Sequence, residues 1–160
     1  MSRAVQVATL AGVLGCGLVG GVCFAFSSFI MPALDRLPAA QAVAAMQSIN
    51  KLAVTPAFML AFIGSALVCA GLAIWALLSG IEGASAWALA GSVVFLLGVI
   101  VMSFAGNIPL NDSLDGVDPH AAGAAARWND YIASWMPLNH VRAAAGLVSS
   151  GLLAIALRAA

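Results

Sequence analysis

Charged side chains are scarce in this sequence, which has six basic and six acidic residues among 160. A soluble domain carries charge on roughly a quarter of its residues, so this composition excludes an ordinary soluble protein. The charges also cancel, and no basic run is present that would bind nucleic acid or recruit anionic lipid. We therefore expect no nucleic-acid partner, and we expect the partners to be apolar molecules.

Cysteine is rare as well, and the three cysteines follow no motif. Cys16, Cys23 and Cys69 lie inside apolar runs without C-x-x-C spacing. This arrangement predicts neither a redox pair nor a thiolate metal site. It also argues against a quinone-linked thiol oxidoreductase, because that chemistry needs paired cysteines. We expect the three thiols to be buried as small hydrophobic side chains.

Long apolar runs make up most of what is present. The composition is 63% hydrophobic and the mean hydropathy is +1.06. About 20 apolar residues cross a hydrocarbon core, and four segments approach or exceed that length: residues 5–30, 56–78, 86–105 and 141–157. We predict an all-α, multi-pass integral membrane protein, with a single four-helix transmembrane domain over residues 1–160. The first run is too long for a signal peptide, so we interpret it as a retained helix.

The connections between these segments predict the layout of the bundle. The short, glycine-rich segment 79–85 indicates antiparallel neighbours. The two long connections, 32–56 and 107–139, should therefore lie on one membrane side, opposite both termini. Small residues at four-residue spacing, such as Gly12 and Gly20, predict close helix packing and permit self-association into a homo-oligomer. The few Lys and Arg residues leave the orientation in the membrane undetermined.

The first long connection contains a predicted short helix over residues 39–54. Val43 and Met46 share one face of this helix, a pattern typical of a segment that rests at the membrane interface or caps the bundle. Asn50 near its end is a candidate binding residue. It either turns toward a site or forms local hydrogen bonds at the surface.

Polar residues concentrate at the end of the third apolar run. Asn107 and Asn111 flank Pro109, which removes a backbone donor, so we predict that the helix breaks there. The two amides then either satisfy the freed backbone groups or take part in a site.

The next polar residues form an acidic segment. Asp112, Asp115, Asp118 and His120 follow closely, but they lack the ligand register of a calcium loop, so we predict a solvated loop. A metal or haem site formed by His120 together with His140 remains as an alternative.

Three aromatic residues follow at helical spacing. Trp128, Tyr131 and Trp135 share one face of a predicted helix over residues 121–136. Two interpretations stay open. The rings form an interfacial belt at headgroup level, or they bind a flat aromatic ligand by stacking.

The last polar cluster opens the fourth apolar run. Pro137 should end the preceding helix, and Asn139 should cap the next one. Arg142 would then lie in the first helical turn, where the helix dipole disfavours a cation, so it needs an anionic partner. Asp112, Asp130 or a ligand oxyanion would serve. A guanidinium beside the imidazole of His140 and several amides is suited to stabilising an enolate or a phenolate.

These motifs together resemble those of the anthrone oxygenase-like membrane family. The resemblance is carried by Asn107-x-Pro-Leu-Asn111, by Trp128 with Trp135, and by Asn139-His-Val-Arg142. It implies a small four-helix membrane protein whose relatives oxidise anthrones to anthraquinones with O2.

The resemblance also implies roles for individual residues. His140 or Asp112 would remove the benzylic proton, while Arg142, Asn111 and Asn139 would hold the resulting anion. Asn107 would also belong to the catalytic site. Trp128, Tyr131 and Trp135, with Asn50, would line the substrate site. The sequence has no phosphate-binding glycine motif and only two histidines, which is consistent with a reaction without a cofactor.

A non-enzymatic function is the alternative. The same polar residues would then bind a lipid, a quinone or a protein partner. The enzymatic interpretation requires that Asn107, Asn111, His140 and Arg142 converge on one pocket that also contains an aromatic ring. If Arg142 faces solvent and Trp128 faces lipid, that interpretation fails.

Overall fold

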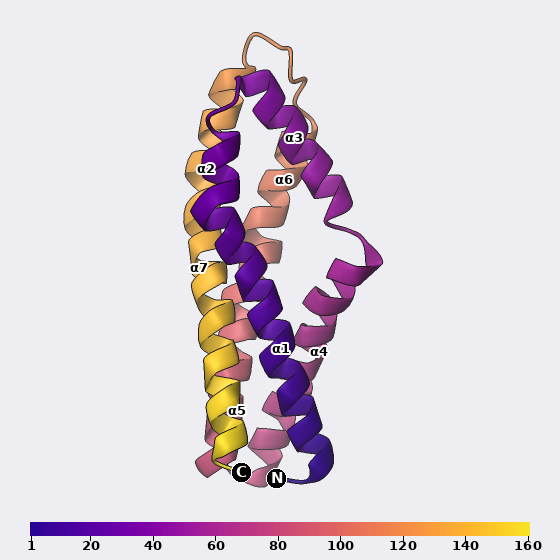
Figure 1. Cartoon of the computed structure of the whole chain (residues 1–160), viewed down its shortest axis with the longest axis vertical. Helices are drawn as coiled ribbons and strands as arrows, with labels where there is room; N and C mark the ends of the chain where they lie inside the picture. The colour runs from indigo at the N-terminus through magenta and orange to yellow at the C-terminus, as the bar shows by residue number, and fades with distance from the viewer.

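The computed structural model describes residues 1–160 and contains helices without any strand. Four helical stretches are long and apolar enough to cross a membrane: Arg3–Leu34, Pro56–Ser79, Gly83–Asp115 and Ala124–Arg158. They form an elongated bundle with both termini at the same end (Figure 1). The predicted all-α, multi-pass membrane architecture is confirmed.

Two of the long stretches are built from several helical segments. The first comprises α1 (Arg3–Ala25), the π-helix η1 (Phe26–Ile30) and α2 (Met31–Leu34). The third comprises α5 (Gly83–Phe95), the π-helices η2 (Leu96–Val101) and η3 (Ser103–Asn107), and α6 (Ile108–Asp115). The remaining helices are α3 (Ala39–Leu52), α4 (Pro56–Ser79) and α7 (Ala124–Arg158). Insertions of π-helix inside α-helices are frequent at functional sites.

The helix breaks predicted at Pro109 and Pro137 are wrong. Pro109 lies in the first turn of α6, directly after η3, where the wider π-helical backbone accommodates the proline ring and the lost donor. Pro137 lies on an exposed face inside α7, and membrane helices tolerate proline when neighbouring groups satisfy the freed carbonyl. Asn139 therefore does not cap a helix, and Arg142 lies in the middle of α7 instead of its first turn.

The length of the helices shows which part of the bundle matches a membrane. The 24 residues of α4 span about 36 Å, whereas the 35 residues of α7 span about 52 Å, at 1.5 Å per residue. A hydrocarbon core is about 30 Å thick, so α4 matches it and α7 exceeds it. The additional length of α7 lies at the end that carries α3 and the 116–123 connection, opposite both termini (Figure 1).

Two hydrophobic cores hold the bundle together. The larger core joins α1, α4, α5 and α7 through side chains such as Val19, Leu72, Phe95 and Leu153. Here Gly20 and Gly146 lie back to back, because a Cβ atom on Gly20 would meet the Gly146 backbone at 2.8 Å. The close packing predicted from small residues is present at this crossing.

The smaller core lies between α3, α6 and the first half of α7, and it contains Met31, Ala42, Val43, Met46, Leu114, Trp128, Tyr131 and Trp135. The side-chain amide of Gln47 ties α3 to this core by donating to the carbonyls of Leu114 and Val117 at 2.9 and 2.8 Å. Val43 and Met46 face inward as predicted. The position of α3 at a membrane interface stays a prediction.

Candidate functional site

A cavity of about 500 Å³ lies where α3 turns into α4, opposite η3 and α6. One wall is polar and consists of Asn50, Lys51, Ser103, Asn107, Asn111, Asp112, Asp115 and Arg142. The other wall is apolar and is formed mainly by Phe58, Met59, Phe62, Phe104 and Ile108. Val54 and Phe104 of the cavity lining are 67% and 57% exposed, so the cavity is open at the side of the bundle.

Arg142 reaches this cavity from the middle of α7. Its Nη1 donates to Oδ1 of Asn139 at 3.4 Å, and its Nε is buried without any partner. Neither Asp112 nor Asp130 is hydrogen-bonded to it, although both are candidate anionic partners from sequence. A half-buried, incompletely paired guanidinium within a membrane protein is costly and marks a candidate functional site.

Asn107 presents an unpaired acceptor. The side chain is 1% exposed, and its Nδ2 donates to the carbonyl of Trp135 at 3.2 Å. Because a carbonyl can only accept, this bond fixes the orientation of the amide. The Oδ1 atom is then left buried and without a partner, beside the cavity that Asn107 lines.

Asn111 has the opposite arrangement. Its Oδ1 accepts from Tyr131 Oη at 2.9 Å and from Trp135 Nε1 at 2.8 Å. Both partners are donors, so the amide nitrogen is left for the cavity that Asn111 lines. The polar wall therefore offers donors from Arg142 and Asn111.

The aromatic residues of α7 lie behind this wall. Trp128, Tyr131 and Trp135 are 3%, 5% and 4% exposed, and neighbouring ring centroids are 5.7 and 6.3 Å apart. Trp128 Nε1 donates to Asp35 at 2.9 Å. The interfacial belt is therefore wrong for these rings, because their polar edges find partners inside the protein. None of the three rings lines the Arg142 cavity, so they are not placed to stack on a ligand there. Tyr131 and Trp135 instead support Asn111 by donating to it.

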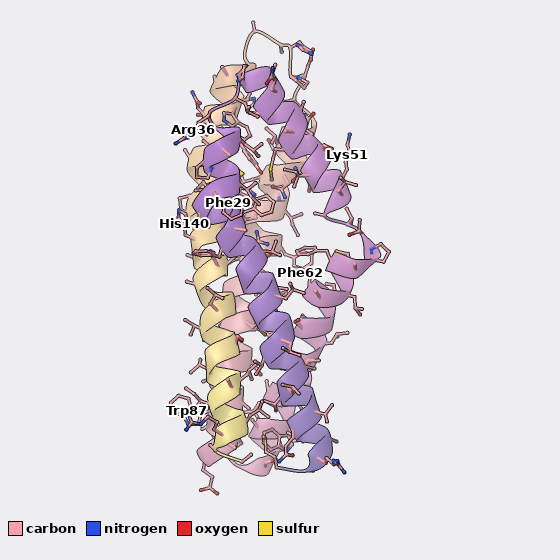
Figure 2. The ribbon with its side chains drawn as sticks, in the orientation of Figure 1. Phe29, Arg36, Lys51, Phe62, Trp87 and His140 are labelled. Atoms are coloured by element: carbon pink, nitrogen blue, oxygen red, sulfur yellow. The ribbon has the colours of Figure 1, made fainter.

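His140 lies on the other side of α7. Two residues along an α-helix differ by about 200°, which directs His140 away from Arg142 toward α1. Its Nδ1 is 2.9 Å from Ser27 Oγ. The His140 side chain is exposed at the outer edge of the bundle, whereas Phe62, which lines the Arg142 cavity, lies between α1 and α4 (Figure 2). The predicted convergence is thus found for Asn107, Asn111 and Arg142 and is wrong for His140.

Asn139 connects the two sides of α7. Its Nδ2 donates to the Cys23 carbonyl at 2.8 Å and to Ser27 Oγ at 2.9 Å, and its Oδ1 accepts from Arg142. The amide is 1% exposed and fully used within the protein. Asn139 therefore holds Arg142 and is not free to contact a ligand. Ser27, which η1 brings to this position, is a residue that the sequence did not suggest.

The carboxylates border the cavity on α6. Asp115 accepts from Asn50 Nδ2 at 3.3 Å, so Asn50 does turn toward the cavity. Asp112 lines the same cavity and forms no hydrogen bond with another side chain. The sequence placed Asp115 in a solvated loop, although Ser103, Asn107, Asn111 and Asp115 are spaced by four residues and share one helical face. The assumed break at Pro109 concealed that periodicity.

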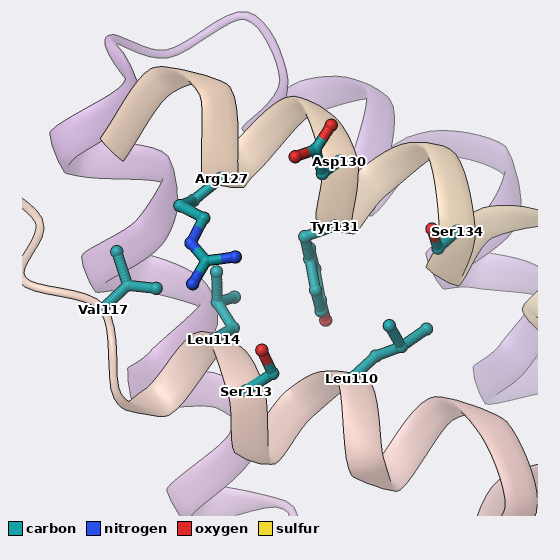
Figure 3. A pocket seen from close by; sticks show the side chains of 8 residues that line it. All are labelled: Leu110, Ser113, Leu114, Val117, Arg127, Asp130, Tyr131 and Ser134. Atoms are coloured by element: carbon teal, nitrogen blue, oxygen red, sulfur yellow. The ribbon is translucent and has the colours of Figure 1, made fainter. Parts of the chain in front are cut away.

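A second, smaller cavity of about 180 Å³ lies between α6 and α7. Figure 3 shows Tyr131 extending from α7 between Arg127 and Leu110 toward α6. Asp130 and Ser134 border it from α7. This cavity is separated from Arg142, so Asp130 belongs to a different surface from the one predicted.

The two histidines are far apart. His120 lies in the connection before α7, where its backbone nitrogen donates to Asp118, and His140 follows the start of α7 by about 24 Å along the helix axis. These positions give no support to one metal or haem held by both histidines, and that alternative stays a prediction. No group of three or more His, Cys, Asp and Glu side chains is arranged to hold a metal ion.

Comparison with known proteins gives one family. The family model described as anthrone oxygenase matches residues 58–152, which is more than half of the chain. The matched region runs from the first turn of α4 into α7 and includes Phe58, Asn107, Asn111 and Arg142. No curated protein and no solved structure matches.

Proposed function

The chain belongs to the anthrone oxygenase family, and we propose that it is a membrane oxygenase that oxidises a flat, hydrophobic, enolisable substrate of the anthrone type with O2. The observation that carries this proposal is the incompletely paired Arg142 guanidinium on a cavity with an apolar wall. Such a cavity suits a molecule that is apolar over most of its surface and develops negative charge at one oxygen.

The apolar wall suits the ring system of such a substrate. Phe58 and Phe62 lie on successive turns of α4, with ring centroids 6.1 Å apart and planes inclined by 19°. Phe104 faces the cavity from η3. Aromatic side chains contribute both area and stacking geometry to flat ligands. They take the role that the sequence assigned to Trp128 and Trp135.

The polar wall suits the anion. Removal of a benzylic proton from an anthrone places an electron pair on the ring carbonyl oxygen as an enolate. Arg142 and the amide nitrogen of Asn111 would hold that oxygen, because fixed donors stabilise developing charge without reorganisation. Asp112 is the proposed base, since it lines the cavity with its carboxylate uncommitted to other side chains. His140 does not fit the role of base, because it lies on the other side of α7, away from the cavity.

The oxidation itself requires no electron carrier other than the substrate. The enolate carbon transfers its electrons to O2 and forms a C–O bond, which gives a hydroperoxide after protonation. Loss of the second C–H proton with cleavage of the O–O bond then yields the ketone and one water. The overall reaction converts one substrate methylene group and one O2 into one ketone and one water. We propose that no cofactor takes part.

Turnover in proteoliposomes tests the proposal. Anthrone is supplied under O2, and anthraquinone formation and O2 uptake are measured after subtraction of spontaneous oxidation. Wild type should form one anthraquinone per O2 consumed. The turnover of Arg142→Met should be at least 100-fold lower, since removal of one anion-binding donor lowers kcat by a factor of about 10²–10³. Arg127→Met is the matched control on the same helix, because Arg127 lines the other cavity.

Two outcomes would contradict the oxygenase. Equal turnover in wild type and Arg142→Met would remove the guanidinium from the reaction. Saturable anthrone binding without any quinone product in wild type would favour the non-enzymatic alternative, in which the cavity binds a lipid or a quinone.

A further inference from the structure

A chain of hydrogen bonds runs from the cavity to the outer edge of the bundle. Arg142 Nη1 donates to Asn139 Oδ1 at 3.4 Å, and Asn139 Nδ2 donates to Ser27 Oγ at 2.9 Å. Ser27 Oγ in turn lies 2.9 Å from Nδ1 of His140. The chain therefore links η1 with α7, and Arg142 is its one member that lines the cavity.

The chemistry of the groups gives this chain a direction. A guanidinium and an amide nitrogen can only donate, so Arg142 donates to Asn139, and Asn139 donates to Ser27. The Ser27 hydroxyl has one hydrogen of its own, and His140 Nδ1 is the acceptor within reach of it. A neutral imidazole that accepts at Nδ1 carries its proton on Nε2. Bonds that follow one another in this way polarise each other.

Ser27 is needed because the Asn139 amide is closed off from water. That amide is 1% exposed, and its nitrogen donates to the Cys23 carbonyl at 2.8 Å as well as to Ser27. These two acceptors hold the nitrogen toward α1 and η1, which directs Oδ1 toward Arg142. The guanidinium depends on this oxygen, because its Nε is buried without any partner.

We propose that Ser27 is a positioning residue, which holds the Asn139 amide and through it keeps the Arg142 guanidinium at the cavity. His140 ends the chain by accepting the Ser27 hydrogen. This role rests on the proposed function, in which the guanidinium holds the substrate anion. Ser27 does not line the cavity, so it acts through Asn139 and contacts no substrate there.

Ser28 provides a matched control in the same π-helix. It follows Ser27 directly, but its hydroxyl donates to the Phe24 carbonyl at 2.7 Å within its own helical stretch. Both serines border an outer groove of about 320 Å³, which leaves room for the additional methyl group of Ser27→Thr. The two alanine variants therefore each remove one hydroxyl from the same groove, and Ser27→Ala alone interrupts the chain.

Nitrogen NMR of the full chain in micelles, with isotope-labelled histidine and arginine, tests the chain without any turnover. His140→Ala and Arg142→Met identify the signals of these two residues. At alkaline pH, His140 Nδ1 should be unprotonated and hydrogen-bonded. Ser27→Ala should shift the Nδ1 signal and the Arg142 side-chain signals, whereas Ser28→Ala should shift neither.

Two results of this measurement would overturn the proposal. One is a proton on His140 Nδ1, because Ser27 would then accept from both neighbours and the chain would lose its direction. The other is a set of Arg142 signals that stays unchanged in Ser27→Ala. The wild-type Nδ1 signal still decides the direction of the chain if Ser27→Ala fails to fold.

Anthrone turnover in proteoliposomes tests what the chain contributes to the reaction. The kcat of Ser27→Ala should fall by about two- to tenfold, as expected for the loss of one hydrogen bond, with little change in KM. Ser27→Thr keeps the hydroxyl and should restore kcat, and Ser28→Ala should match wild type. Equal kcat in Ser27→Ala and Ser28→Ala would overturn the positioning role. Absence of turnover in wild type would instead contradict the oxygenase, and the NMR signals alone would then decide whether Ser27 positions Arg142.

Discussion

Trp135 donates its indole hydrogen to Oδ1 of Asn111 over 2.8 Å, and this bond determines which end of the Asn111 amide faces the cavity. The indole is 4% exposed and has no access to a ligand in that cavity. Its contribution is therefore orientation. The donor that Asn111 offers to an anion depends on a tryptophan behind it, on a different helix.

Trp135→Phe should lower turnover without abolishing it. The substitution keeps the aromatic packing and removes one neutral hydrogen bond, worth about 1 kcal/mol, which corresponds to roughly fivefold in rate. Tyr131 Oη would still hold the amide. The measurement is kcat for anthrone oxidation. Trp128→Phe is the control, because Trp128 donates to Asp35, and equal losses in both variants would assign the effect to packing.

Asn107→Leu should weaken substrate binding without lowering the thermal stability of the protein. The leucine removes a buried acceptor that has no partner, an atom whose desolvation costs about 1–3 kcal/mol, and it loses the bond to Trp135. We expect a thermal unfolding midpoint in detergent that is unchanged or higher, together with an increased KM. A large fall in the midpoint with unchanged KM would show that Asn107 has only a structural role.

The fold could be predicted from composition, but the site only in part. Four apolar runs suffice to define the bundle, since each must cross the membrane as a helix. The helix end at Pro109 was wrong because π-helical insertions such as η3 are set by tertiary packing and leave no sequence pattern of their own. The helix end at Pro137 was wrong because α7 carries this proline on an exposed face without a break. The same error divided Asn107, Asn111 and Asp115 between a helix and a loop, although they share one helical face.

The aromatic belt failed for a different reason. Trp128, Tyr131 and Trp135 have the spacing of an interfacial belt, and only the docking of α3 and α6 against α7 buries them. The three cysteines are buried as predicted, but the sulfur atoms of Cys16 and Cys69 lie 3.6 Å apart only because α1 and α4 cross at Gly15. Contacts between distant segments decide both cases, and no local pattern contains them.

Gly20→Ala should destabilise the bundle much more than Gly21→Ala. A Cβ atom on Gly20 would lie 2.8 Å from the Gly146 backbone, whereas one on Gly21 would meet nothing within 4 Å. Backbone cannot move aside cheaply, so we expect a loss of about 1–3 kcal/mol for the first variant and no loss for the second. Denaturant unfolding in mixed micelles measures both. Equal stabilities would show that α1 and α7 are not packed as described.

Asn139→Ala should impair turnover far more than His140→Ala, although the two residues are adjacent. Loss of the Asn139 amide removes the acceptor for Arg142 and leaves the Cys23 carbonyl without this donor. We expect kcat of Asn139→Ala to fall by about tenfold or more, since a hydrogen bond to a charged group contributes about 1.5–3 kcal/mol. His140 contacts only Ser27 at the outer edge of α7. A larger loss in His140→Ala would make the imidazole a candidate base again.

Asp112→Asn should reduce kcat and leave KM nearly unchanged, because the carboxylate is proposed to remove a proton and not to bind the ring system. General base catalysis contributes about 10²–10⁴ in rate, so a loss of at least 100-fold is expected. Asp115→Asn is the matched control: it lies one turn further along α6, lines the same cavity and is already bonded to Asn50.

Deuterium at the benzylic carbon of the substrate distinguishes a missing base from a distorted site. If proton removal limits turnover, the kinetic isotope effect in Asp112→Asn should be at least as large as in wild type, since the weakened step becomes more limiting. In Asp115→Asn it should equal the wild-type value. An isotope effect that vanishes in Asp112→Asn, or a greater loss of kcat in Asp115→Asn, would show that Asp112 is not the base. Neither result would contradict the anion-binding role of Arg142.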